Sequence, residues 1–254
     1  MRIRDEQLRV LDDASQLPFE NFMVAHLAEF TPMHMGTLGA DGMRALVRQG
    51  VERARRYGFV SRGPVRFYIE LIVLLGIDFD EDPQYPWVAE TLLDDSIGGE
   101  IERADWLHDQ VIGLLETAAG PKRAFAIQSL HRARQLPFRG VSPSSADFEG
   151  VVARMMGEMY PEKAHYVGEG ALRNLARAAV VEAGRKETAT DEGVCLFAGL
   201  MFAVGRGFYR DPKYPWIAGT LGNPRLTTPE ARAERLYSKT MTYLDHVLDN
   251  LRAQ

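Results

Sequence analysis

The stretch Asp82-Pro83-Gln84-Tyr85-Pro86-Trp87 returns later in the chain as Asp211-Pro212-Lys213-Tyr214-Pro215-Trp216, so that Trp216 follows Trp87 by 129 positions (216 − 87). The same offset, applied without a gap, matches further identical pairs on both sides of the motif. These pairs include Phe19 with Phe148, Pro32 with Pro161, Gly39 with Gly168, Arg44 with Arg173, Gly76 with Gly205, Arg103 with Arg232 and Leu107 with Leu236. A register held over this length indicates an internal duplication, in which each half is one copy of a structural unit.

The repeated motif predicts a rigid corner between two helices. Each proline moves the residue before it out of the helical region, and Asp-Pro favours a turn. The corner therefore holds Trp87 and Trp216 in a fixed direction. A tryptophan in such a place most often fills a core between helices, and less often it is an exposed anchor for a partner.

The spacing of apolar residues predicts helices nearly everywhere and no alternating strands. Amphipathic helices are expected over 43–57 and 172–183, and a buried core helix over 69–79. Earlier helices should run over 19–30 and 148–160, ending at Pro32 and Pro161, and later ones over about 100–117 and 229–251. Ser61 and Thr190 are placed to cap the apolar helices. The predicted fold is all-α, with two pseudo-symmetric helical bundles.

The predicted domains are a first helical repeat over residues 1–119, a basic connector over 120–146 and a second repeat over 147–254. Between Thr117 and Ala146 there is no Asp or Glu, but there are five basic residues: Lys122, Arg123, Arg132, Arg134 and Arg139. Two readings stay open for this segment, a solvated linker helix and a docking strip for an acidic partner surface.

Composition limits the kind of protein. The 254 residues are 46% hydrophobic and 26% charged, with a formal net charge of −5, which argues against a general nucleic-acid binder. A single cysteine, Cys195, lies in an apolar run and predicts a buried, inert thiol. The sequence shows no signal-peptide pattern and no apolar segment long enough to span a bilayer, so we expect a cytoplasmic protein without membrane insertion.

The usual catalytic and cofactor motifs are missing from the sequence. The six histidines form no metal-binding pair, and Asp78, Asp80 and Asp82 fail as a calcium loop because Pro83 and Ala89 replace its essential Gly and Glu. We therefore expect no cofactor, no metal and no catalytic residue.

Two longer segments suggest a family. The run Gly205-Arg206-Gly207-Phe208-Tyr209-Arg210-Asp211-Pro212, followed by Pro215-Trp216, and the helix end Arg56-Tyr57-Gly58 resemble small, uncharacterised helical proteins encoded in bacterial type VI secretion clusters near spike and toxin genes. The resemblance covers each half almost end to end, although Lys186-Glu187 stands where the first copy has Tyr57-Gly58. It implies a cytoplasmic, partner-binding protein that handles or neutralises a secreted effector.

Three functions follow from these observations. The first is an adaptor or chaperone for a type VI effector, for which Met155, Met156 and Met159 would offer an adaptable surface. The second is an immunity protein that covers a toxin, and the third is an enzyme with an unrecognised site. The expected partner is a protein, with partner-binding candidates at Trp87, Trp216, Tyr85, Tyr214 and the five basic residues of the connector, Lys122, Arg123, Arg132, Arg134 and Arg139.

Overall fold

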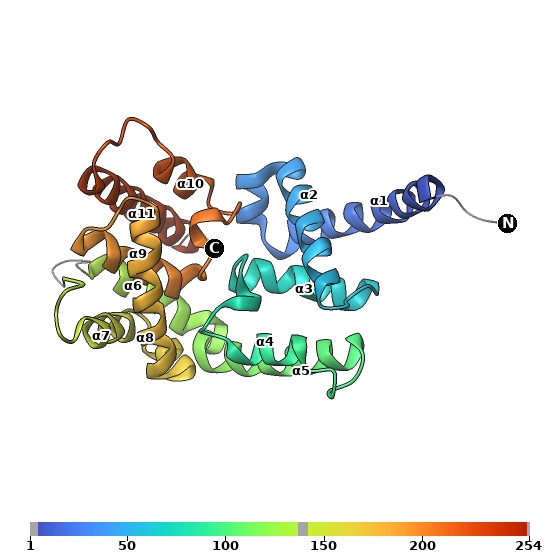
Figure 1. Ribbon diagram of the computed structural model, residues 1–254, viewed down its shortest axis with the longest axis horizontal. Helices are drawn as coiled ribbons and strands as arrows, with labels where there is room; N and C mark the ends of the chain where they lie inside the picture. Colours follow the sequence, from blue (N-terminus) through green and yellow to red (C-terminus); the bar gives the residue numbers. More distant parts are fainter. Residues whose placement is uncertain (1–4, 137–141, 253–254) are drawn as a thin grey trace. The chain divides into compact units, whose positions relative to one another are not determined.

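The computed structural model describes residues 5–136 and 142–252, with side chains from Leu17 onward, and this part of the chain contains helices and no strand (Figure 1). The all-α prediction is confirmed. In chain order the α-helices are α1 Asp5–Phe30, α2 Pro32–Arg56, α3 Arg62–Leu75, α4 Pro86–Leu93, α5 Glu100–Leu114, α6 Ala124–Gln135, α7 Phe148–Met159, α8 Pro161–Arg185, α9 Asp191–Val204, α10 Pro215–Leu221 and α11 Pro229–Arg252. Shorter helical turns are η1 Phe79–Glu81, η2 Leu115–Ala119, η3 Pro121–Arg123 and η4 Phe208–Arg210.

The chain forms two compact units. Unit 1 consists of residues 1–74 and 93–104, and unit 2 consists of residues 75–92 and 105–254. Residues 75–92, which carry the first corner motif, thus belong by their contacts to the same unit as the second motif. Units defined by contacts and repeats defined by sequence need not share boundaries, so the domain boundaries at 119 and 147 stay a prediction.

Proline sets the ends of the early helices as expected. α1 ends at Phe30 and α7 at Met159, and the residues before the following prolines, Thr31 and Tyr160, have φ of −142° and −144°. These residues lie outside the helical region because a following proline ring clashes with helical backbone at that position.

Helix bounds recur at the offset found in the sequence. The bounds of α8 follow those of α2 by 129 residues at both ends, and those of α9 follow those of α3 in the same way. Gly39 breaks α2 with φ 65° and ψ 178°, and Gly168 breaks α8 with φ 81° and ψ 159°. The predicted helices 43–57 and 172–183 are therefore parts of longer, broken helices.

The predicted core helix over 69–79 is wrong at its end. α3 stops at Leu75 because Gly76 has φ of 108°, a conformation that ends the helix and that glycine adopts without strain. Ile77 and Phe79 are nevertheless buried, as the apolar pattern indicated.

In unit 1, α1 packs on α2, and the buried Glu20 of α1 accepts a 2.9 Å hydrogen bond from Arg48 Nε. This bond is the main reason why the pKa of Glu20 lies below its usual value. Gly50 lets α2 approach α3 closely, because a Cβ there would lie 2.6 Å from Ile69 Cγ1. The hydroxyl of Ser61 donates to Glu100.

In unit 2, α9 is the central helix and packs against α7, α8 and α11. Every residue from Gly193 to Phe202 is buried, including Cys195 at 1% exposure, which confirms the predicted buried thiol. Thr190 caps α9, since its side chain accepts a 2.9 Å hydrogen bond from the Gly193 amide, as predicted.

The connector contributes to the core of unit 2. Its helix α6 packs against α7 and α11, and Ser129 and Ala133 are buried. The interpretation of this segment as a solvated linker helix is therefore wrong for the side of α6 that carries Ser129 and Ala133. The small side chains on that side allow close packing. Arg139 lies outside the described residues.

Candidate binding pocket

The two corner motifs meet each other inside unit 2. The Ile77 amide donates to Asp211 Oδ2 at 3.2 Å, and the Arg206 amide, 129 residues after Ile77, donates to Asp82 Oδ2 at 2.8 Å. Each aspartate also accepts from the backbone amide two residues later in its own turn, at 2.9 Å in both motifs. The aspartates of the motif thus tie the two corners together through buried, reciprocal hydrogen bonds.

Glycines allow this crossing. A Cβ on Gly76 would lie 2.7 Å from the Val204 carbonyl oxygen, and a Cβ on Gly205 would lie 2.5 Å from the Leu75 carbonyl oxygen. Both glycines have φ near 100°, at 108° and 102°. The two backbones therefore approach at a distance that only glycine permits.

Buried charges surround the crossing. Lys163 Nζ donates to the Phe202 carbonyl oxygen at 2.5 Å and lies 5.5 Å from the centre of the Tyr85 ring. Burial lowers the pKa of Lys163 to about 8, and burial also raises the pKa of Asp82. Lys213 lies 3.4 Å from Asp211, and burial lowers its pKa. These lysines are held by carbonyls, carboxylates and rings, which is the arrangement of a structural charge network.

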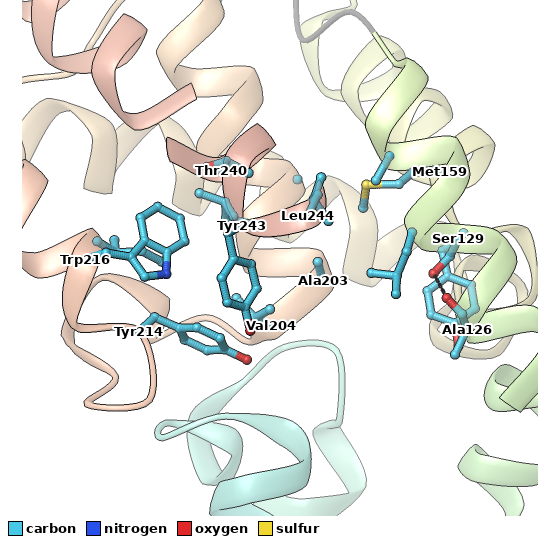
Figure 2. Close-up of a pocket in the computed structure, with 16 residues that line it drawn as sticks. Ala126, Ser129, Met159, Ala203, Val204, Tyr214, Trp216, Thr240, Tyr243 and Leu244 are labelled. Atoms are coloured by element: carbon cyan, nitrogen blue, oxygen red, sulfur yellow. Dashed lines mark hydrogen bonds between the residues drawn. The ribbon is translucent and has the colours of Figure 1, made fainter. Parts of the chain in front are cut away.

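An apolar pocket of about 240 Å³ lies beside this crossing, also within unit 2 (Figure 2). Its walls come from α6, the end of α7, α9, α10 and α11. In Figure 2 the rings of Trp216, Tyr214 and Tyr243 lie on one side, Met159, Ser129 and Ala126 lie on the other, and Ala203 lies between them. The described residues that line it are Ala126, Ser129, Leu130, Ala133, Met159, Tyr160, Gly199, Leu200, Ala203, Val204, Tyr214, Trp216, Ile217, Thr240, Tyr243 and Leu244.

The size of the pocket suits one side chain. Its volume of about 240 Å³ falls below the range of roughly 300–1,000 Å³ that is usual for small-molecule sites, and exceeds the roughly 150 Å³ of a cavity that holds benzene.

Three polar side chains of the lining donate to backbone carbonyls. Ser129 Oγ donates to the Ala126 carbonyl at 2.7 Å, Thr240 Oγ1 to the Leu236 carbonyl at 2.8 Å, and the Tyr160 hydroxyl to the Ala118 carbonyl at 2.7 Å. The Trp216 indole nitrogen differs, because it is buried and has no hydrogen-bond partner in the part of the chain that the structure describes. In Figure 2 this nitrogen lies on the side of the indole that faces Tyr243. The pocket thus has mostly apolar walls, and the indole nitrogen of Trp216 lies buried in one of them.

The pocket has no group suited to proton transfer near neutral pH. Its ionisable lining residues are three tyrosines, and burial raises the pKa of each, that of Tyr160 to about 12.

The aromatic residues that were predicted to bind a partner lie partly in the pocket wall and partly in the core. Trp87 and Trp216 are both half-buried, so neither is a full core plug or a fully exposed anchor. Tyr214 is 8% exposed and belongs to the pocket wall. Tyr85 is 3% exposed and its ring is packed beneath Lys163, and contact of Tyr85 with a partner stays a prediction.

The predicted basic candidates do not share one environment. Arg134 donates to Asp245 of α11 at 2.7 Å and 3.3 Å, and Arg132 lies 3.6 Å from Glu162. Lys122 and Arg123 are exposed and have φ of 50° and 61°. Carboxylates of the same chain therefore pair with Arg134 and Arg132, two of the five basic residues. A docking strip for an acidic partner stays a prediction for Lys122 and Arg123.

Sequence reasoning missed most of the pocket. Met159, Ala203, Tyr243 and Leu244 come from three helices that are far apart in the chain, and no local pattern connects them. Their only signal was apolar periodicity, which core residues share.

Among the described residues, no three His, Cys, Asp or Glu side chains lie together as metal ligands would, and none of the described helices is both long and apolar enough to cross a membrane. Comparison of the chain with protein-family models, with curated proteins and with solved structures gave no match.

Proposed function

We propose that this protein binds another protein without catalysing a reaction, and that the pocket beside Trp216 receives an apolar side chain of that partner. The observation that carries the proposal is the combination of apolar walls, a volume of about 240 Å³ and a buried indole N–H without an acceptor. A peptide supplies both needs, because its side chain fills the pocket and a neighbouring carbonyl accepts from the indole. An acidic protein is a poor match for nucleic acid.

We also propose that the chain consists of two pseudo-symmetric copies of one helical unit. The matching bounds of α2 with α8 and of α3 with α9 support this, as do the reciprocal bonds of Asp82 and Asp211. The copies differ at the pocket, since Leu74 and Leu114 stand where the second copy has Ala203 and Tyr243. The second copy would then have diverged toward binding.

Within this class, a cytoplasmic adaptor or chaperone for a type VI secretion effector is the first candidate, on the strength of the corner motifs. The methionine residues give this candidate little support. Met156 and Met159 are buried in the core and Met155 is only partly exposed, so the predicted methionine surface is mostly core packing. An immunity protein that covers a basic toxin is the second candidate, favoured by the net charge of −5. An enzyme with an unrecognised site is the remaining alternative.

The pocket is tested by filling it. Ala203 is exposed at the pocket and Ala218 is exposed on α10 outside it, so Ala203→Phe and Ala218→Phe form a matched pair. The tagged chain is co-expressed with the proteins encoded beside it, and complexes are measured by co-purification. We expect Ala203→Phe to abolish the complex and Ala218→Phe to retain it. Equal binding by both variants refutes the pocket, and absence of any complex refutes the neighbour-binding role.

A toxicity assay separates the two candidates. If co-expression protects cells from a neighbouring toxin, the protein is an immunity protein. If it raises only the yield or secretion of that toxin, the protein is an adaptor.

A further inference from the structure

The outer face of α5 carries an exposed tryptophan among carboxylates. Trp106 is 42% exposed and Ile112 is 41% exposed, although both are large and apolar. Asp105, Asp109 and Glu116 are exposed as well. Spacings of four and three residues place Asp105, Asp109 and Ile112 along one side of α5, with Trp106 beside them, and Glu116 follows in η2, which continues directly from α5. We call these five residues the α5 outer face.

The opposite side of the helix accounts for its packing. Leu107, Val111 and Leu114 are all buried, at 0%, 4% and 4% exposure. The helix is therefore anchored without help from Trp106 or Ile112, which leaves the outer face available.

The fold does not require tryptophan at this position. At the offset of 129, the buried Leu107 corresponds to Leu236, which is also 0% exposed, whereas Trp106 corresponds to the exposed Arg235. If the helices are copies, as proposed above, a solvated charged side chain suits this position, and packing does not explain the tryptophan. Exposed tryptophan is typical of binding hot spots.

The charge of the face selects the partner. Three carboxylates lie on it, and residues 105–116 contain no lysine or arginine. The one histidine among them, His108, has its Nδ1 3.7 Å from an oxygen of Asp109. A carboxylate attracts arginine or lysine, and so does the face of an indole ring. An anionic membrane or a nucleic acid is repelled by the same charges.

We propose that the α5 outer face docks a basic surface of the protein partner, with an arginine or lysine placed over Trp106 between Asp105 and Asp109. The proposal rests on the proposed function in one respect, that the partner is a protein. The pocket beside Trp216 and this face are independent of each other, since they share no residue.

The test uses the full chain and a fluorescently labelled, arginine-rich amphipathic peptide as probe, with binding measured by fluorescence anisotropy at low and at moderate salt. Asp105→Asn/Asp109→Asn is compared with Glu158→Gln/Glu234→Gln, which removes the same charge from exposed positions on α7 and α11. We expect the first variant to weaken binding about three- to tenfold and the second to leave it within about twofold. Trp106→Arg, which uses the residue of the second copy, should weaken binding about tenfold or more.

Equal losses in the two charge variants would overturn the proposal, because only net charge would then matter. It would also be overturned if Trp106→Arg bound like the wild type, or if a peptide with glutamate in place of arginine bound equally well. Ala203→Phe should leave probe binding unchanged. Failure of the pocket would show as partner binding that survives Ala203→Phe, and failure of the α5 outer face as probe binding that survives Trp106→Arg.

Discussion

Replacing Gly205 by alanine should disrupt unit 2 far more than the same change at Gly168. Both glycines have positive φ with nearly extended ψ, at 102° and 154° for Gly205 and at 81° and 159° for Gly168. Alanine in this region costs about 1–3 kcal/mol of backbone strain at either site. The two sites differ in their neighbours, because a Cβ at Gly168 meets nothing within 4 Å, whereas at Gly205 it would lie 2.5 Å from the Leu75 carbonyl oxygen.

The added cost at Gly205 comes from moving two backbones apart. The Arg206 amide, next in the chain, donates at 2.8 Å to the buried Asp82, and separation weakens this bond and the reciprocal one to Asp211. A buried polar group left unsatisfied costs about 1–3 kcal/mol. We therefore expect losses of about 2–6 kcal/mol for Gly205→Ala and about 1–3 kcal/mol for Gly168→Ala.

The measurement is thermal and urea unfolding followed by far-ultraviolet circular dichroism. At about 2–4 °C per kcal/mol for a chain of this size, the added cost of about 1–3 kcal/mol should lower the Tm of Gly205→Ala about 2–12 °C further than that of Gly168→Ala. Gly76→Ala, which meets the Val204 carbonyl oxygen at 2.7 Å, should behave like Gly205→Ala. If all three variants lost the same stability, the crossing of the two corners would not be the tight contact described above.

Two further predictions concern the buried polar groups. The pKa of Lys163 in the folded protein, about 8, lies below its unfolded value of 10.5, so the unfolded chain binds more protons between these pH values and stability should rise with pH from about 8 to 10.5. The gain is on the order of 3 kcal/mol, measured by urea unfolding as the difference between wild type and Lys163→Met, and an identical pH dependence of the two proteins would contradict it. Trp216→Phe should leave Tm unchanged or slightly raised, because it removes a buried donor that has no acceptor, yet it should weaken partner binding in the co-purification assay. A large fall in Tm would mean that the indole N–H is satisfied, and binding as strong as that of the wild type would mean that the partner does not use it.

The sequence by itself determined the parts of this protein that depend on near neighbours. Helix ends before Pro32 and Pro161, the cap at Thr190 and the all-α class follow from local sterics and hydrogen bonding, and the structure confirms them. The burial of Cys195 followed from its apolar neighbours.

Only the tertiary structure decided which distant groups meet. Apolar periodicity predicts that a side chain points into the core, but it does not predict whether other atoms fill the space beside that side chain. The pocket next to Trp216 could therefore not be predicted from the sequence. The packing of α6 into the core of unit 2 could not be predicted for the same reason, since Ser129 and Ala133 carry little apolar signal. The reciprocal bonds of Asp82 and Asp211 join residues more than a hundred positions apart. Such contacts depend on how whole helices pack, and packing is a property of the assembled chain that no short stretch of residues contains.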